Sequence, residues 1–176
     1  MRVVSGIHKG RRIKVPKYFD LRPTTDFAKE GLFNVLNNTI EIEGLEVLDC
    51  FFGTGNISLE FISRGASEVT SVDINKDSYK FLSGIASEWG IENIEVYRSD
   101  VFIHLRQDYN KYDLIFADPP FDLEERTTIP DLVFENELLK EDGMLIVEHS
   151  SQTDFTKHKN FVKTKKFGSV FFTFFE

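Results

Sequence analysis

The chain has 176 residues, 41% of them hydrophobic, and a formal net charge of −8, which fits one compact domain over residues 1–176 and excludes a disordered chain. No apolar run approaches the roughly 20 residues of a membrane-spanning helix, and the basic, polar N-terminus is unlike a signal peptide. Cys50 is the only cysteine and the four histidines have no ligand spacing, so we expect a cytoplasmic protein with neither disulfides nor a metal.

Positive charge is concentrated at the N-terminus. Residues 1–22 hold seven basic residues and one acidic residue, which leaves a charge of −14 for residues 23–176. A basic arm on an acidic body is typical of local contact with phosphates, although a solvated surface hairpin accounts for it equally well. The residues predicted to contact RNA are Arg2, Lys9, Arg11, Arg12, Lys14 and Arg22.

The first elements in chain order are a hairpin and a helix. Residues 2–4 and 11–15 flank a glycine-containing turn, which predicts a β-hairpin that ends at Pro16. Hydroxyl and acidic groups at residues 24–26 are typical of a helix start, and the apolar pattern from Phe27 onward predicts a helix to about residue 38.

Strands and helices then alternate. Strands are expected at residues 47–50, 69–72, 94–97, 114–117 and 144–147, with helices at residues 57–64, 76–89, 101–105 and 129–139. A final hairpin is expected at residues 161–166 and 170–175. This order predicts a doubly wound α/β domain whose mainly parallel sheet binds ligands outside the carboxyl ends of its strands.

A glycine-containing loop follows the first strand of the alternating region. Gly53 and Gly55 allow the backbone to turn sharply and to approach a ligand closely. Ser58 stands where a dinucleotide-binding loop would have its third glycine. The loop therefore favours a nucleoside ligand without a pyrophosphate over NAD.

Acidic residues end the next two strands. We predict that Asp73 accepts hydrogen bonds from both ribose hydroxyls, because Asn75 can cap the following helix in its place. Asp100 either accepts a hydrogen bond from the 6-amino group of adenine or caps its own helix, and both roles stay open. The predicted cofactor-binding residues on these loops are Asp49, Phe51, Gly53, Thr54, Gly55, Asp73, Ile74, Asp100 and Val101.

The most specific motif follows the fourth strand of the alternating region and is the predicted catalytic element. It consists of Asp118, Pro119, Pro120 and Phe121. Asp118 and the Pro119 carbonyl can accept both hydrogens of an aromatic amine, which localises the lone pair on its nitrogen, and the carboxylate stabilises the developing positive charge. Phe121 offers a ring face to a flipped base. A rigid turn alone explains the prolines but neither of the residues that flank them.

These motifs resemble those of class I methyltransferases that act on exocyclic amines. More specifically, the chain resembles the bacterial 16S rRNA guanine-N2 methyltransferases of the RsmD type. The segments that carry this likeness are residues 2–6, 9–11, 21–26, 32–34, 48–51, 59–60, 63–66 and 147–148, together with residues 118–121.

The resemblance implies a Rossmann-like, seven-stranded sheet with one antiparallel strand, S-adenosylmethionine as the methyl donor, and a guanine of small-subunit rRNA as the acceptor within an assembled particle. It also implies that Arg22, Pro23, Thr24 and Thr25 line the active-site side of the cofactor pocket. Two residues depart from the family pattern. Phe52 replaces a small residue and could narrow the methionine end of the pocket, and Lys29 replaces an arginine and so loses bidentate geometry.

Three other functions compete with this interpretation. A DNA adenine-N6 methyltransferase would use the same amine chemistry, but 176 residues leave no room for an added recognition domain. A non-catalytic module that binds S-adenosylmethionine or rRNA would not need Asp118. A methyltransferase that acts on small molecules would not need the basic N-terminal arm. We therefore expect an rRNA methyltransferase, acting as a monomer.

Overall fold

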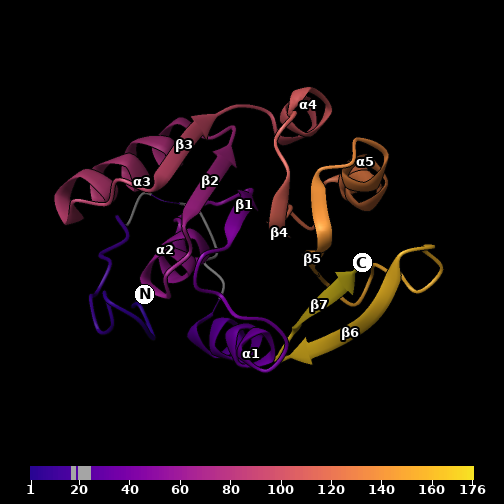
Figure 1. Ribbon diagram of the computed structural model, residues 1–176, viewed down its shortest axis with the longest axis horizontal. Helices are drawn as coiled ribbons and strands as arrows, with labels where there is room; N and C mark the ends of the chain where they lie inside the picture. The colour runs from indigo at the N-terminus through magenta and orange to yellow at the C-terminus, as the bar shows by residue number, and fades with distance from the viewer. Residues whose placement is uncertain (17–18, 20–24) are drawn as a thin grey trace.

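The computed structural model describes residues 1–16, 19 and 25–176. Figure 1 shows one twisted sheet with helices on both of its faces. The strands are β1 Glu46–Cys50, β2 Glu68–Asp73, β3 Ile94–Arg98, β4 Tyr112–Ala117, β5 Leu139–His149, β6 Phe161–Phe167 and β7 Val170–Phe175. The helices are α1 Asp26–Asn37, α2 Asn56–Ser63, α3 Lys76–Trp89, α4 Val101–Gln107 and α5 Ile129–Glu135, with a short 3-10 helix at Glu124–Thr128.

The sheet has seven strands in the order β3-β2-β1-β4-β5-β7-β6. The first five pair in parallel, and β7 runs antiparallel to both β5 and β6. The prediction of a seven-stranded, doubly wound α/β sheet with one antiparallel strand is therefore confirmed. Strands β1 and β4 form its centre, which places the ends of these two strands next to each other.

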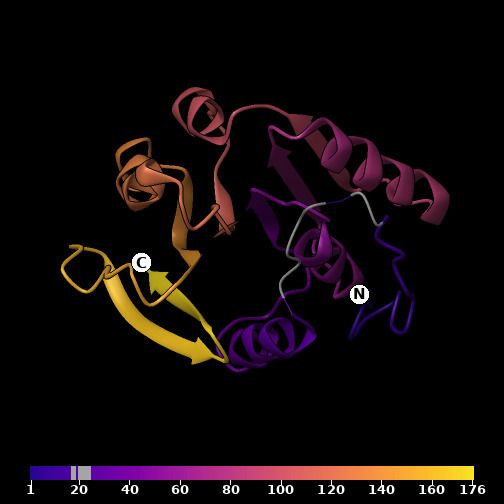
Figure 2. The same ribbon diagram turned by 180° about the vertical axis from the view of Figure 1, so that it is seen from behind.

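Each central strand contributes to two hydrophobic cores because its successive side chains point to opposite faces. Val47 packs in the core that α1 and α2 cover, whereas Leu48 packs in the core that α4 and α5 cover. A smaller core around Leu82 joins α3 and α2 to the N-terminal segment, which we define as residues 1–16. The helices seen on either side of the sheet in Figures 1 and 2 thus bury both of its faces.

Two elements differ from the sequence-based predictions. The N-terminal segment folds back on itself through backbone hydrogen bonds, but its β-structure is limited to a single antiparallel bridge between Arg2 and Arg12. Helix α5 ends at Glu135 rather than near residue 139. Glu137 has a left-handed φ of 52°, and Leu139 already belongs to β5, where it pairs with Tyr112 of β4.

None of the helices among the described residues has the length and hydrophobicity that crossing a membrane requires.

Candidate active site

Strand register brings the predicted site residues to one edge of the sheet. Cys50, the last residue of β1, pairs with Val72 of β2 on one side and with Ala117 of β4 on the other. The glycine loop, Asp73 and Asp118 therefore leave three adjacent strands at the same level. This edge is formed by the carboxyl ends of the parallel strands, where α/β sheets bind ligands.

The glycine loop has a backbone conformation that few other residues could adopt. Gly53 has a φ of 53° and Gly55 a φ of 72°. A Cβ atom on Gly55 would lie 2.5 Å from the Leu82 side chain, so a larger residue there would force that side chain to move. Phe51 also has a positive φ, 60°, and its N–H donates to the Val72 carbonyl at 2.8 Å. This close approach of the loop to β2 fixes its shape.

Asp73 is almost fully buried and is oriented by the backbone on both sides. Its Oδ2 accepts a hydrogen bond from the N–H of Gly53 at 2.9 Å, and its Oδ1 accepts one from the N–H of Asn75 at 2.8 Å. Burial raises the pKa of Asp73, and these two hydrogen bonds oppose that shift. Asn75 caps α3 through Asp77 and Ser78, as predicted, so Asp73 does not serve as the cap.

Asp49 lies beneath the loop and is held by a polar network that the sequence did not reveal. Ser58 donates a short hydrogen bond to Asp49 Oδ2 and accepts one from Ser71 Oγ at 2.9 Å. All three side chains are buried. The pKa of Asp49 is raised to about 7. Burial is the main cause and the nearby charges of Asp118 and Asp73 contribute, whereas the Ser58 hydrogen bonds oppose the shift. Asp49 therefore links the glycine loop to the predicted catalytic element.

This raised pKa predicts how the stability contributed by Asp49 depends on pH. The folded state binds the Asp49 proton more tightly than the unfolded chain does, so this contribution is complete below about pH 4 and is lost as the pH rises through about 7. We expect Asp49→Asn to gain stability relative to the parent protein over that range. Urea unfolding of both proteins at several pH values measures the difference, and a difference that does not change with pH would contradict the shift.

Asp100 occupies the helix-capping position that the sequence left open. Its Oδ1 accepts the N–H of Ile103 at 3.0 Å, which caps α4. The cap uses one carboxylate oxygen and leaves the other available to a ligand. Ile74 is 63% exposed beside Asp73, whereas Val101, the first residue of α4, is buried.

Asp118 follows β4 directly, and its N–H donates to the Cys50 carbonyl at 3.3 Å. Its side chain is partly buried, Pro119 is buried, and Pro120 is exposed. The Pro120 carbonyl accepts the N–H of Leu123 at 3.0 Å, which closes a turn and presents the half-exposed ring of Phe121. The motif therefore combines a fixed carboxylate with an accessible aromatic ring.

The N-terminal segment is fastened to α2 by a buried polar cluster. Glu60 accepts the backbone N–H groups of Val4 and Ser5 at 2.8 and 3.0 Å, and its carboxylate pairs with Lys29 at 3.1 Å and with Arg64 at 2.8 Å. Lys29 also donates to Asn56, the first residue of α2, at 2.7 Å. The Lys29 substitution noted in the sequence therefore lies in a cluster that connects this segment to the glycine loop.

The basic residues of the segment differ in their surroundings. Arg2 pairs with Glu30 of α1 at 3.2 Å, whereas Arg11 lies 4.8 Å over the Trp89 ring. Lys9, Arg12 and Lys14 are exposed. Arg22 and Thr24, also predicted site residues, lie outside the described residues.

Two further residues near the loop contact the N-terminal segment. Thr54 is buried and donates to Met1 Sδ at 3.1 Å. Phe52 is buried in the small core with Val3 and Ile13. Its ring is thus accommodated beneath the N-terminal segment, and the structure gives no support to the expectation that it narrows the cofactor pocket.

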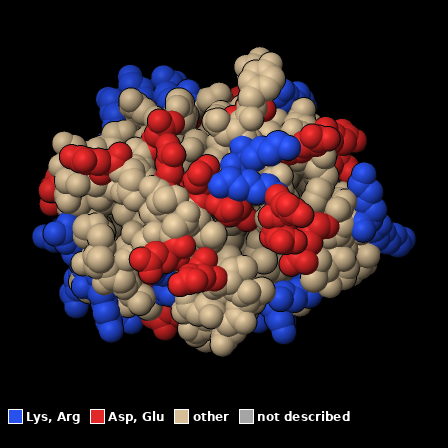
Figure 3. Space-filling view, in the orientation of Figure 1, with Lys and Arg blue, Asp and Glu red and all other residues tan. Residues whose placement is uncertain are grey.

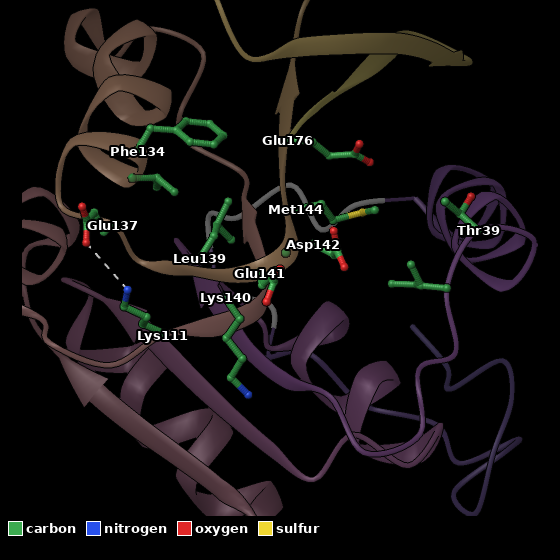
Figure 4. Close-up of a pocket in the computed structure, with 13 residues that line it drawn as sticks. Thr39, Lys111, Phe134, Glu137, Leu139, Lys140, Glu141, Asp142, Met144 and Glu176 are labelled. Carbon is green, nitrogen blue, oxygen red and sulfur yellow. Dashed lines mark ion pairs between the residues drawn. The ribbon is translucent and has the colours of Figure 1, made fainter.

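A hollow on the protein surface lies away from these residues. It has a volume of about 700 Å³ and is lined by the first half of β5, the end of α5, and Lys111, as Figure 4 shows. Because Leu139 pairs with Tyr112 at the start of β4, this hollow lies at the amino end of the strands. The predicted site lies at the opposite edge.

A family model described as conserved hypothetical protein 95 matches residues 1–176. This chain belongs to that family. Members of the conserved hypothetical protein 95 family include proteins named ribosomal RNA small subunit methyltransferase D. The protein of that name from Escherichia coli strain K12 is 33% identical over 84% of this chain and 74% of its own length. The one from Buchnera aphidicola subsp. Baizongia pistaciae is also 33% identical, over 86% of this chain and 76% of its own length.

A solved structure described as "Putative methyltransferase yhhF from Escherichia coli" is 28% identical, covers 99% of this chain and 96% of that chain, and has a TM-score of 0.86. The resemblance to the RsmD type is thus confirmed.

Proposed function

We propose that this protein is an S-adenosylmethionine-dependent methyltransferase that modifies the N2 amine of a guanine in 16S rRNA. The observation that carries the proposal is the position of Asp118, directly beside the glycine loop at the carboxyl edge of the sheet. The names of the relatives support rRNA as the substrate. We propose further that it acts as a monomer in the cytoplasm, on a small-subunit particle or an assembly intermediate.

The residues at this edge fit a nucleoside cofactor. Asp73 is an acceptor suited to the two ribose hydroxyls, the exposed Ile74 offers an apolar surface to the adenine, and Asp100 retains a free acceptor for its amino group. The positive φ angles of Gly53 and Gly55 keep side chains away from the loop backbone. When bound here, S-adenosylmethionine would supply an electrophilic methyl group.

Asp118 and the Pro119 carbonyl would act on the substrate amine. The lone pair of an exocyclic amine is delocalised into the base, which makes the nitrogen a poor nucleophile. Two acceptors that bind both N–H hydrogens favour a pyramidal nitrogen and localise the lone pair on it. The carboxylate also stabilises the positive charge that develops on nitrogen as the new bond forms. Phe121 would stack on the base once it has been flipped out.

The N-terminal segment offers RNA a group of exposed basic residues on a chain that is acidic overall. Figure 3 shows a face on which Asp and Glu spread over the middle, while most Lys and Arg lie along the outline. The exposed Lys9, Arg12 and Lys14 belong to the N-terminal segment, which packs on α2 next to the glycine loop. An acidic body would repel RNA elsewhere and so limit unspecific binding.

Neutralising Arg11 and Arg12 together is expected to weaken RNA binding and to flatten its salt dependence. The slope of log K against log salt concentration is negative. Each lost phosphate contact reduces its magnitude by about 0.7 for single-stranded RNA and by about 0.9 for duplex RNA, by analogy with DNA. Fluorescence anisotropy of an rRNA fragment at several salt concentrations measures this slope for Arg11→Gln/Arg12→Gln. The control is Lys111→Gln/Lys140→Gln, which removes two charges at the opposite edge. An unchanged slope would mean that these basic residues do not contact the RNA phosphates.

Mass mapping of modified nucleosides in rRNA, from cells with and without the gene, tests the proposed reaction. We expect one N2-methylguanine in 16S rRNA to disappear with the gene and to return with the intact gene. Loss of an N6-methyladenine instead would contradict the guanine assignment. An unchanged set of modified nucleosides would contradict the methyltransferase proposal.

A further inference from the structure

Phe27 is an aromatic residue that the fold leaves in solvent. The helix pattern in the sequence includes it among the apolar residues of α1, but its side chain is 67% exposed, while the next residue, Ala28, is buried. Phe27 is the second residue of α1, two positions after the cap Thr25. Packing of the core therefore does not account for a phenylalanine at this position.

The turn of the C-terminal hairpin lies beside this ring. A Cβ atom on Gly168, in the turn between β6 and β7, would lie 3.9 Å from Phe27 Cδ1. One turn further along α1, a Cβ atom on Gly31 would overlap the Phe167 ring, at 2.3 Å. Figures 1 and 2 both show the end of β6 against α1. Phe27 and the hairpin turn thus form one continuous surface.

Positive charge is concentrated in the segment that leads to this surface. Residues 155–168 contain five lysines and no acidic residue, although the whole chain carries a net charge of −8. Lys165 and Lys166 are exposed near the end of β6. Successive side chains of a strand point to opposite faces. Lys165 pairs with Phe172 of the core that α1 covers, so it lies on the same face as α1. Lys166 lies on the opposite face, where its ammonium is 5.4 Å from the centre of the Phe171 ring.

The surface lies at the same edge of the sheet as the catalytic element. Lys166 pairs with Phe171 of β7, which pairs with His149 at the carboxyl end of β5. Val147, two residues before His149, pairs with Ala117, which precedes Asp118. Because β6 is three strands from β4, the spacing of strands gives a lateral separation of about 14 Å. A few nucleotides of RNA would span this distance.

We propose that Phe27 and Lys165 form a second RNA-binding surface, at which an unpaired nucleotide near the target base stacks on Phe27 while its phosphate contacts Lys165. An accessible aromatic ring beside a positive charge is the arrangement with which proteins bind single-stranded nucleic acid. Lysines on an edge strand also prevent sheet-to-sheet association. That role explains the charges on β6 but leaves the exposed ring of Phe27 unexplained. The inference rests on the proposed function, since it takes RNA as the substrate.

Fluorescence anisotropy with a labelled, unstructured oligouridylate tests this surface. Phe27→Ala is expected to lower the affinity about tenfold, which is the loss of one stacked base, with an unchanged salt slope. Lys165→Gln is expected to reduce the magnitude of the salt slope by about 0.7, the value for one phosphate contact of a single strand. Phe27→Tyr retains a ring and should bind like the parent protein.

Matched controls separate this surface from a general loss of charge or aromatic area. Tyr109→Ala removes an aromatic residue that is 97% exposed just before β4, and Lys111→Gln/Lys140→Gln removes two lysines from the same amino edge. Both controls should leave the affinity unchanged. If Phe27→Ala binds as tightly as the parent, or if Tyr109→Ala loses as much, the stacking surface is refuted.

Methyl transfer to rRNA by the unmodified protein distinguishes the two proposals. An active enzyme whose RNA affinity does not depend on Phe27 overturns this inference and leaves the proposed function intact. A protein that methylates no rRNA overturns the proposed function, whereas a Phe27-dependent affinity measured in the same protein still supports the surface. Thermal unfolding of Phe27→Ala should match the parent, because the side chain is exposed.

Discussion

Replacement of Asp118 by alanine is expected to reduce methyl transfer by roughly a thousandfold, while S-adenosylmethionine binding stays within a few-fold. An interaction that a charged or polar group makes mainly in the transition state is worth this much in comparable active sites. Asp118 lies next to the glycine loop, but the groups suited to the cofactor belong to Asp73, Ile74 and Asp100. Calorimetry measures cofactor binding, and transfer of a labelled methyl group to rRNA measures turnover.

Two further variants make the test of Asp118 specific. Asp118→Asn retains an acceptor for the amine but loses the negative charge, so an intermediate rate is expected. Asp122→Ala removes an exposed acid four residues further along the chain and should leave both measurements unchanged. Cofactor binding lost with turnover retained would contradict the assigned role.

Asp118 also provides a readout independent of turnover. Its charge is one of the causes that raise the pKa of Asp49. Asp118→Ala should therefore lower the Asp49 pKa and move the pH-dependent loss of stability to a lower pH. An identical pH profile in the variant would show that the two carboxylates are not coupled.

The fold could be predicted where the responsible interactions are local. Helix α3 was predicted to within a residue because Asn75 caps its start and Gly90, with a φ of 65°, ends it. The edge that carries the site was also predicted, because parallel strands align their carboxyl ends. Helix α5 was predicted too long because the sequence has neither Gly nor Pro where the chain leaves the helix, and Glu137 takes the left-handed conformation instead.

Long-range polar contacts could not be predicted in this way. In the sequence, Ser58 stands out only because a dinucleotide-binding loop would have its third glycine there, but in the structure it orients Asp49. Lys29 was noted only as a departure from the family, but it is fully buried and pairs with Glu60, 31 positions further along the chain. Sequence patterns report periodicity and local caps, whereas these pairs depend on how α2 packs against β1 and against α1.

The second large effect is expected at Glu60, where alanine should lower the free energy of unfolding by about 3 to 5 kcal/mol. The substitution leaves the buried Lys29 ammonium without its carboxylate and leaves the N–H groups of Val4 and Ser5 without acceptors. The matched control is Glu30→Ala, because Glu30 pairs with Arg2 at 3.2 Å on the surface, where such a pair contributes less than about 1 kcal/mol.

The pH dependence of Glu60→Ala distinguishes a buried charge from a simple loss of packing. Burial lowers the pKa of Lys29, and Glu60 opposes that shift, so the pKa should fall further in the variant. A buried lysine with a lowered pKa destabilises the fold at pH values at which it is protonated. This destabilisation is lost as the pH rises through the pKa of the lysine, because the folded protein then releases the proton. The deficit of Glu60→Ala relative to the parent should therefore shrink toward alkaline pH.

Release of the N-terminal segment should accompany this loss of stability. Because the Glu60 carboxylate fixes the segment to α2, trypsin should cleave after Lys9, Arg11 or Arg12 faster in Glu60→Ala than in Glu30→Ala. A pH-independent deficit with unchanged cleavage would mean that packing, and not the buried charge, fastens the segment. If the segment positions RNA for methylation, faster cleavage must coincide with weaker RNA binding, since the basic residues would no longer be fixed relative to the glycine loop.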